Sequence, residues 1–172
     1  MNTYYVNNFN RMDVAELCEY IEKRHHTNTR ETCSELLDHL KSSVKLESSK
    51  HPELKKILVL FKELHEELEQ HFSREEKILF PIVKELRNGG KKNGSASTDK
   101  MLEKPLKMMN EEHVKVYALL HQLRELSGGY EAPSGCAPSL KVAYKELHEL
   151  EQDLMRQFYL EENILNIKLK TQ

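Results

Sequence analysis

The sequence lacks a basic excess, long apolar runs and paired cysteines, features that identify several large classes of protein. Its formal net charge is −2, so it has none of the basic excess that nucleic-acid-binding surfaces need. Its longest unbroken aliphatic and aromatic run, residues 57–61, is far too short to span a membrane. Residues 1–13 contain no apolar stretch of a secretory signal, and the three cysteines form no CxxC pair, a pattern typical of reduced intracellular thiols. We therefore expect a cytoplasmic protein that binds neither nucleic acid nor membranes.

Glycine and proline are also scarce, with six and five residues in 172, and they gather in a few places. The polar or glycine-rich stretches predict loops at residues 42–52, 88–99 and 127–138. Between them lie four long segments rich in Leu, Glu and Lys without strand alternation, at about residues 13–46, 52–87, 102–127 and 139–169. Pro52, Pro105 and Pro138 lie near the segment starts, where a helix tolerates proline. The pattern predicts an all-α fold, an antiparallel up-down-up-down four-helix bundle forming one domain over residues 1–172.

What the sequence does have in excess is histidine, with nine residues. At 100° per residue, His71 and Glu75 fall on the apolar face of the second segment, and His113 falls near the centre of the apolar face of the third. Gln157 and Glu161 fall on the apolar face of the fourth. Polar groups on such faces are costly to bury without partners, so these positions are candidates for a functional site.

An internal repeat connects these positions. Residues 71–80, HFSREEKILF, match residues 157–166, QFYLEENILN, at five of ten positions. The spacing from His26 to His71 is 45 residues and that from His113 to Gln157 is 44. The chain therefore consists of two similar helical hairpins, and their site residues are His26, His71 and Glu75 in the first and His113, Gln157 and Glu161 in the second.

The first segment offers two adjacent histidines, His25 and His26, both near the rim of a wide apolar stripe. Aligning His25 with His113 would place glutamates of the first hairpin opposite leucines of the second. Aligning His26 with His113 instead places Leu36 opposite Leu123. We therefore prefer His26 as the site residue and expect His25 to lie at the rim.

Imidazoles and two carboxylates that converge in a bundle core suit a two-metal centre in which each glutamate bridges the ions. The donor set favours iron, manganese or zinc over calcium or magnesium, which prefer oxygen ligands alone. No cysteine belongs to the set, which argues against an iron–sulfur cluster. The ferritin-type pattern needs two Glu-x-x-His motifs on different helices, and only Glu22 and His25 have that spacing.

The strings EKRHHTNTRE, KHPEL, HFSREEKILFP, EEHVKVY and LEENIL resemble the hemerythrin-like HHE domain, and more closely the RIC group of iron–sulfur cluster repair di-iron proteins. The resemblance covers about residues 13–167. It implies metal ligands at His26, His71, Glu75, His113 and Glu161, with Gln157 where the family has a further histidine. The short N-terminal cysteine-containing domain that many members carry has no counterpart in this sequence.

The resemblance implies two non-haem iron ions, with or without an oxo bridge. Because Gln157 stands where the family has a histidine, we expect the second hairpin to hold its ion less tightly than the first, or to leave one coordination position to water or another ligand. It also implies a stress-response protein that repairs iron–sulfur clusters after nitrosative or oxidative damage, by donating iron or handling nitric oxide. Iron–sulfur proteins would then be its clients, and oxygen and nitric oxide its small ligands. Two alternatives stay open: a binding or sensing module for oxygen or nitric oxide that turns nothing over, and a bundle that has lost its metal.

Overall fold

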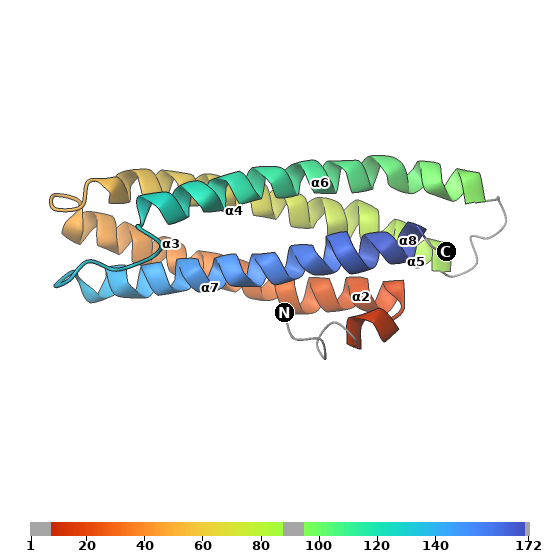
Figure 1. Ribbon diagram of the computed structural model, residues 1–172, viewed down its shortest axis with the longest axis horizontal. Helices are drawn as coiled ribbons and strands as arrows, with labels where there is room; N and C mark the ends of the chain where they lie inside the picture. The colour runs from red at the N-terminus through yellow and green to blue at the C-terminus, as the bar shows by residue number, and fades with distance from the viewer. Residues whose placement is uncertain (1–7, 88–94, 171–172) are drawn as a thin grey trace.

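The protein is an antiparallel four-helix bundle (Figure 1), seen in a computed structural model that describes residues 8–87 and 95–170. Three of its four long helical segments contain a short π-helical stretch. In chain order the elements are α2 (Val14–Tyr20), η1 (Ile21–His26), α3 (Thr27–Glu47), α4 (Glu53–Arg74), η2 (Glu75–Leu79), α5 (Phe80–Arg87), α6 (Ser95–Leu126), α7 (Pro138–Leu160), η3 (Glu161–Leu165) and α8 (Asn166–Lys170).

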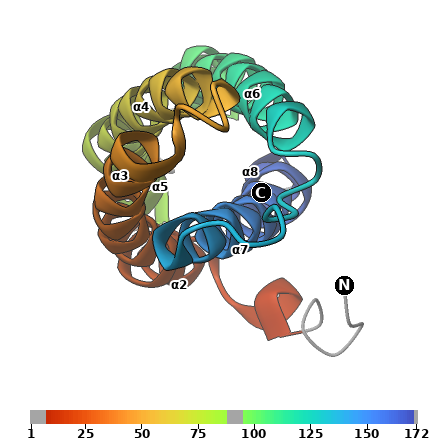
Figure 2. The ribbon, with the colours of Figure 1, turned by 90° about the vertical axis from the view of Figure 1, so that its left-hand side faces the viewer.

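The helices surround a common axis (Figure 2), with α3 lying against both α4 and α7, and α4 lying against α6. The ends of the segments carry the expected local signals. Asp13 caps α2, accepting hydrogen bonds of 2.9 Å from the N–H groups of Ala15 and Glu16, while the Glu16 carboxylate accepts from the Asp13 N–H. After α6 the chain turns through Gly128 and Gly129, whose φ angles of 61° and 79° favour glycine.

The interior consists of two apolar clusters. One lies towards the α3–α4 and α6–α7 connections and includes Phe72 and Phe158. The other lies towards the opposite end and includes Leu79, Phe80 and Leu165. Buried polar residues of η1, α4, α6 and η3 lie at the junction of these clusters, so the bundle shields them from water on both sides.

The third segment differs from expectation. Helix α6 begins at Ser95, so the prediction of a loop over residues 95–99 is wrong; residues 88–94 of that loop lie outside the described residues. Pro105 consequently lies inside the helix and not near its start. None of the helices in the described ranges combines the length and apolar character that crossing a membrane requires.

Candidate metal centre

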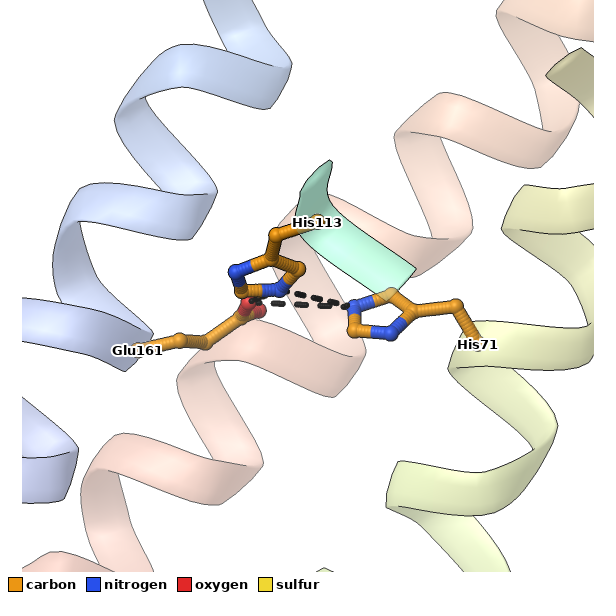
Figure 3. Close-up of side chains that lie close together, drawn as sticks. All are labelled: His71, His113 and Glu161. Carbon is orange, nitrogen blue, oxygen red and sulfur yellow. Dashed lines mark hydrogen bonds and ion pairs between the residues drawn. The ribbon is translucent and has the colours of Figure 1, made fainter. Parts of the chain in front are cut away.

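Five of the six predicted site residues converge inside the bundle. Their nitrogen and oxygen atoms form two groups, His71 with His113 and Glu161, and His26 with Glu75 and Glu161, and within each group the atoms lie within 4.8 Å of one another. Figure 3 shows the first group, in which the His71 ring, the His113 ring and the Glu161 carboxylate point towards one another from three helices. The two groups share Glu161, and each draws on both hairpins.

Both carboxylates lie between imidazoles. Glu75 Oε2 is 3.1 Å from His26 Nε2 and 3.6 Å from His71 Nε2. Glu161 Oε2 is 3.0 Å from His113 Nε2 and 3.8 Å from His71 Nε2. All five side chains are at most 2% exposed. This geometry gives each glutamate access to two positions that a cation could occupy.

The outer nitrogen of each imidazole is held by a further carboxylate. The three Nδ1 contacts are His26 to Glu76 at 2.8 Å, His71 to Glu112 at 2.9 Å and His113 to Glu162 at 2.7 Å. A carboxylate at Nδ1 fixes the proton there and leaves the Nε2 lone pair free, which is the usual arrangement of a metal-ligating histidine. The Nε2 atoms of His71 and His113 lie 3.3 Å apart. Two lone pairs that face each other at this distance repel, and a cation bound by both nitrogens would remove that repulsion.

These three outer carboxylates were missed by the sequence analysis. Glu76 and Glu162 occupy equivalent places in the internal repeat, in which both glutamates of the Glu-Glu pair are identical, and that identity was the available signal. Glu112 has no such signal, because its counterpart ahead of His26 in the first hairpin is His25.

Three of the four helical segments have a π-helical stretch at the candidate centre. Each stretch contains an i→i−5 hydrogen bond: the Thr27 N–H donates to the Glu22 carbonyl, and the same holds for Phe80 to Glu75 and Asn166 to Glu161. The wider turn changes the direction of the side chains relative to an α-helix, and such turns are frequent at functional sites. Here η1 ends at His26, η2 begins at Glu75 and η3 begins at Glu161.

The two hairpins hold their first histidines in the same way. The His26 ring stacks on Phe72 with ring centroids 4.1 Å apart, and the His113 ring stacks on Phe158 at 3.8 Å. Phe72 and Phe158 are equivalent positions of the repeat. Stacking fixes the plane of each imidazole, so its Nε2 stays directed at the neighbouring carboxylate.

Charges at the site favour a cation. Burial lowers the pKa of His71, but Glu75, Glu112 and Glu161 outweigh it and raise that pKa to about 10. Burial likewise raises the pKa of Glu161, but His113 and His71 outweigh it and lower that pKa well below its ordinary value. The carboxylates that hold protons on the imidazoles would equally attract a metal ion in their place.

Gln157 lies beside the centre, outside both groups. It is fully buried, and its Nε2 donates a 2.9 Å hydrogen bond to Glu161 Oε1. Its own Oε1 has no hydrogen-bond partner. Glu161 Oε1 is the oxygen directed away from the His113 contact, so Gln157 occupies the side of the carboxylate that the His71–His113 pair does not use.

His25 departs from the sequence-based expectation. It is only 2% exposed, so the prediction of a rim position is wrong. Its Nδ1 lies 3.3 Å from Asp153 Oδ2 on α7, and its Nε2 has no hydrogen-bond partner. The π-turn of η1 and the packing of its end against α7 bury both adjacent histidines, but His25 belongs to neither group of converging atoms.

Arg30 supports the site through Glu76. Its guanidinium donates to both oxygens of Glu76, at 2.8 and 3.3 Å, and to Glu69. It also lies over the Phe72 ring, 5.3 Å from the centroid. The hydrogen bond with His26 and then the Arg30 cation hold the pKa of Glu76 down at about 2, so this carboxylate stays ionised.

A metal ion fits the residues present. Two buried oxygens, Glu75 Oε1 and Gln157 Oε1, have no hydrogen-bond partner, which is costly for a folded protein unless something else satisfies them. The imidazole nitrogens and carboxylate oxygens that converge there are ligands suited to iron, manganese or zinc. The His and Glu groups could therefore hold a metal cation.

Comparison with known proteins agrees with this chemistry. The family model of the hemerythrin HHE cation binding domain matches residues 20–169. The iron–sulfur cluster repair protein ScdA of Staphylococcus haemolyticus is 24% identical over 158 residues, which are 92% of this chain and 68% of that protein. The iron–sulfur cluster repair protein YtfE is 30% identical in Escherichia coli O81 and 29% in Escherichia fergusonii, each over 152 residues, 88% of this chain. The chain spans about two thirds of the length of these relatives, 64–68%. The chain belongs to the hemerythrin HHE cation binding domain family.

Proposed function

We propose that the chain holds two non-haem iron ions and takes part in repairing iron–sulfur clusters damaged by nitrosative or oxidative stress. The observation that carries the proposal is the pair of ligand groups that share Glu161. One ion would take His71 and His113, the other would take His26, and Glu75 and Glu161 would lie between them. The relatives named as iron–sulfur cluster repair proteins support the choice of process.

The protein's own residues would hold and orient the ions. Glu76, Glu112 and Glu162 fix the three imidazoles, while the surrounding phenylalanines exclude water. Bound iron would supply reversible coordination of small ligands and a store of metal for transfer. Oxygen and nitric oxide are the small ligands in this proposal, and damaged iron–sulfur proteins are the clients.

Gln157 would make the pair of ions unequal. An amide oxygen is a weaker ligand for iron than an imidazole. The expected difference between the two hairpins becomes a difference between the two ions, because each ligand group draws on both hairpins. Gln157 contacts the Glu161 oxygen away from His113, so the ion that does not share His113, the one at His26, would be the labile one. A labile ion suits donation of iron or capture of nitric oxide. We place this activity in the cytoplasm, in keeping with the three free cysteines.

The test is repair of a damaged cluster. Iron-loaded protein is mixed with a [4Fe–4S] dehydratase inactivated by nitric oxide, and the return of dehydratase activity is followed. Glu161→Ala serves as the deficient variant, and Glu149→Ala, an exposed change on the same helical segment 3.5 Å from Lys145, is the matched control. We expect reactivation by the unmodified protein and Glu149→Ala but not by Glu161→Ala.

Equal reactivation by all three proteins would contradict the proposal. A stable, reversible spectrum with oxygen, together with no reactivation by any of them, would favour the binding or sensing module instead.

A further inference from the structure

Arg30 of the first hairpin and Tyr117 of the second occupy equivalent positions of the internal repeat. Each lies four residues after the first histidine of its hairpin, His26 or His113. In the register that aligns these two histidines, Arg30 and Tyr117 therefore correspond. Arginine carries a positive charge and tyrosine does not, so this is a position at which two similar hairpins differ in charge.

In the first hairpin, Arg30 is the outer donor of a chain of three groups. Its Nη1 donates a 2.8 Å hydrogen bond to Glu76 Oε1, and the same oxygen lies 2.8 Å from His26 Nδ1. The guanidinium also lies over the Phe72 ring, on which His26 stacks. Arg30 pairs with Glu69 as well, but Glu69 is 43% exposed and water screens its charge. The positive charge of Arg30 therefore offsets the negative charge of the carboxylate that holds His26.

In the second hairpin, Tyr117 takes the same place. Its hydroxyl donates a 3.3 Å hydrogen bond to Glu162 Oε1, which lies 2.7 Å from His113 Nδ1. The Tyr117 ring meets Phe158 edge-on at 5.5 Å, and His113 stacks on that phenylalanine. Burial and then the Glu162 carboxylate raise the pKa of Tyr117 above its ordinary value of about 10, so the phenol is uncharged at neutral pH.

The three outer carboxylates consequently differ in how their charge is balanced. Glu76 pairs with the Arg30 cation. Glu112 pairs with the Arg74 cation. Within the described ranges, Glu162 forms no ion pair with a lysine or an arginine. Of the three, Glu162 alone directs an uncompensated negative charge at the imidazole that it holds.

We propose that Arg30 and Tyr117 are positioning residues whose difference in charge makes the two ends of the centre unequal. His113 is the stronger ligand and His26 the weaker. A carboxylate at Nδ1 raises the basicity of a metal-ligating imidazole, and a guanidinium that neutralises the carboxylate reduces this effect. The charge of Arg30 also repels a metal cation directly. This asymmetry acts at the outer nitrogens and is separate from that of Gln157, although both make the ion at His26 the looser one. The inference rests on the proposed function, because the histidines serve its two ions.

The first measurement exchanges the outer donor and determines both iron affinities by anaerobic Fe(II) titration against a chromophoric chelator. Arg30→Tyr gives the first hairpin the donor of the second, and we expect the weaker affinity to rise about tenfold, the lower end of the range for groups that support metal ligands. Arg30→Lys keeps the positive charge, and we expect it to leave both affinities unchanged. Since a loosened fold would weaken iron binding, a tighter site separates the effect of charge from a structural role.

The matched control for Arg30→Tyr is Arg124→Tyr, because Arg124 pairs with Glu151 and not with an outer carboxylate of the centre. We expect this control to keep both affinities of the unmodified protein.

The second measurement is the reduction potential of the iron-loaded protein. We expect Arg30→Tyr to shift the potential to a more negative value, because removing a nearby positive charge stabilises the oxidised ion. Arg30→Lys and Arg124→Tyr should have the potential of the unmodified protein.

A variant of the second hairpin keeps the inference testable if thermal melting shows that Arg30→Tyr does not fold. Tyr117→Phe removes only the hydroxyl that fixes Glu162, and we expect the tighter affinity to fall about tenfold. Tyr144→Phe is its control, since Tyr144 is a tyrosine of α7 that packs among apolar residues of the interior.

The outcomes separate this inference from the proposed function. Two ions bound with equal affinities by the unmodified protein, or a weaker affinity that is unchanged or lower in folded Arg30→Tyr, would overturn the inference alone. Unchanged affinities in Tyr117→Phe would do the same. A chain that takes up no iron would overturn the proposed function and this inference with it.

Discussion

Replacing Glu112 tests how strongly the metal centre depends on carboxylates that do not themselves converge on it. Glu112 Oε2 holds His71 Nδ1 at 2.9 Å in a site where His71 is fully buried. Loss of such a partner typically weakens metal binding 10–100-fold, or about 1.4–2.7 kcal/mol. We expect Glu112→Gln to lower the iron affinity about tenfold, because the amide oxygen can still accept the hydrogen bond from His71. We expect Glu112→Ala to lower it about 100-fold.

The assay is an anaerobic Fe(II) titration in competition with a chromophoric chelator. Glu111→Gln is the matched control, since Glu111 is exposed and lies 3.8 Å from Lys107. Arg74→Gln should lower the iron affinity less than Glu112→Ala does. Arg74 pairs with Glu112, and it is Glu112 that contacts His71. Affinities of Glu112→Gln and Glu112→Ala within twofold of the unmodified protein would refute the reasoning.

Three further predictions follow from the geometry. His26→Ala should lose iron, whereas His25→Ala should keep it and only lower the melting temperature, because His25 contacts Asp153 and not the converging atoms; the reverse pattern would show that the wrong histidine was chosen. Gln157→His should bring the two iron affinities closer, and two equal affinities in the unmodified protein would contradict the asymmetry. Burial and then Glu69 raise the pKa of Cys33 to about 12, so this thiol should resist alkylation at pH 9 until the protein unfolds. Its contribution to stability should be constant below about pH 8.5 and fall as pH rises towards 12, because the unfolded thiol ionises first; rapid labelling of native Cys33 at pH 9 would contradict this.

Much of the fold could be predicted from the sequence because the helical spacing of apolar residues repeats over many turns of each long segment. The connection at residues 127–137 lies where glycine and proline predict it. The connection at residues 48–52 is only the second part of the loop predicted over 42–52, because α3 continues to Glu47. The start of α6 was not predictable in this way, since Ser and Thr near residues 95–99 favour loops by their local chemistry while the helix extends through them. Pro105 lies inside that helix for the same reason.

The apolar helix faces and the internal repeat were enough to predict which side chains converge, namely His26, His71, His113, Glu75 and Glu161. They could not predict the π-turns, because the faces were assigned with a fixed angle of 100° per residue. At η1 that turn and the contact with α7 bury His25 beside His26. At η2 and η3 the second residue of the stretch is a glutamate that contacts a histidine of another helix. The contact between Glu112 and His71 depends on the packing of α4 against α6, which no pattern within one helix encodes.

The central claim is that two ions share Glu161, and its most direct test is the iron stoichiometry of the unmodified protein and of Glu161→Ala under anaerobic Fe(II) titration. Because both groups include Glu161, we expect two ions per chain in the unmodified protein and fewer than one in the variant. Two ions bound by Glu161→Ala, or none bound by the unmodified protein, would contradict the shared centre.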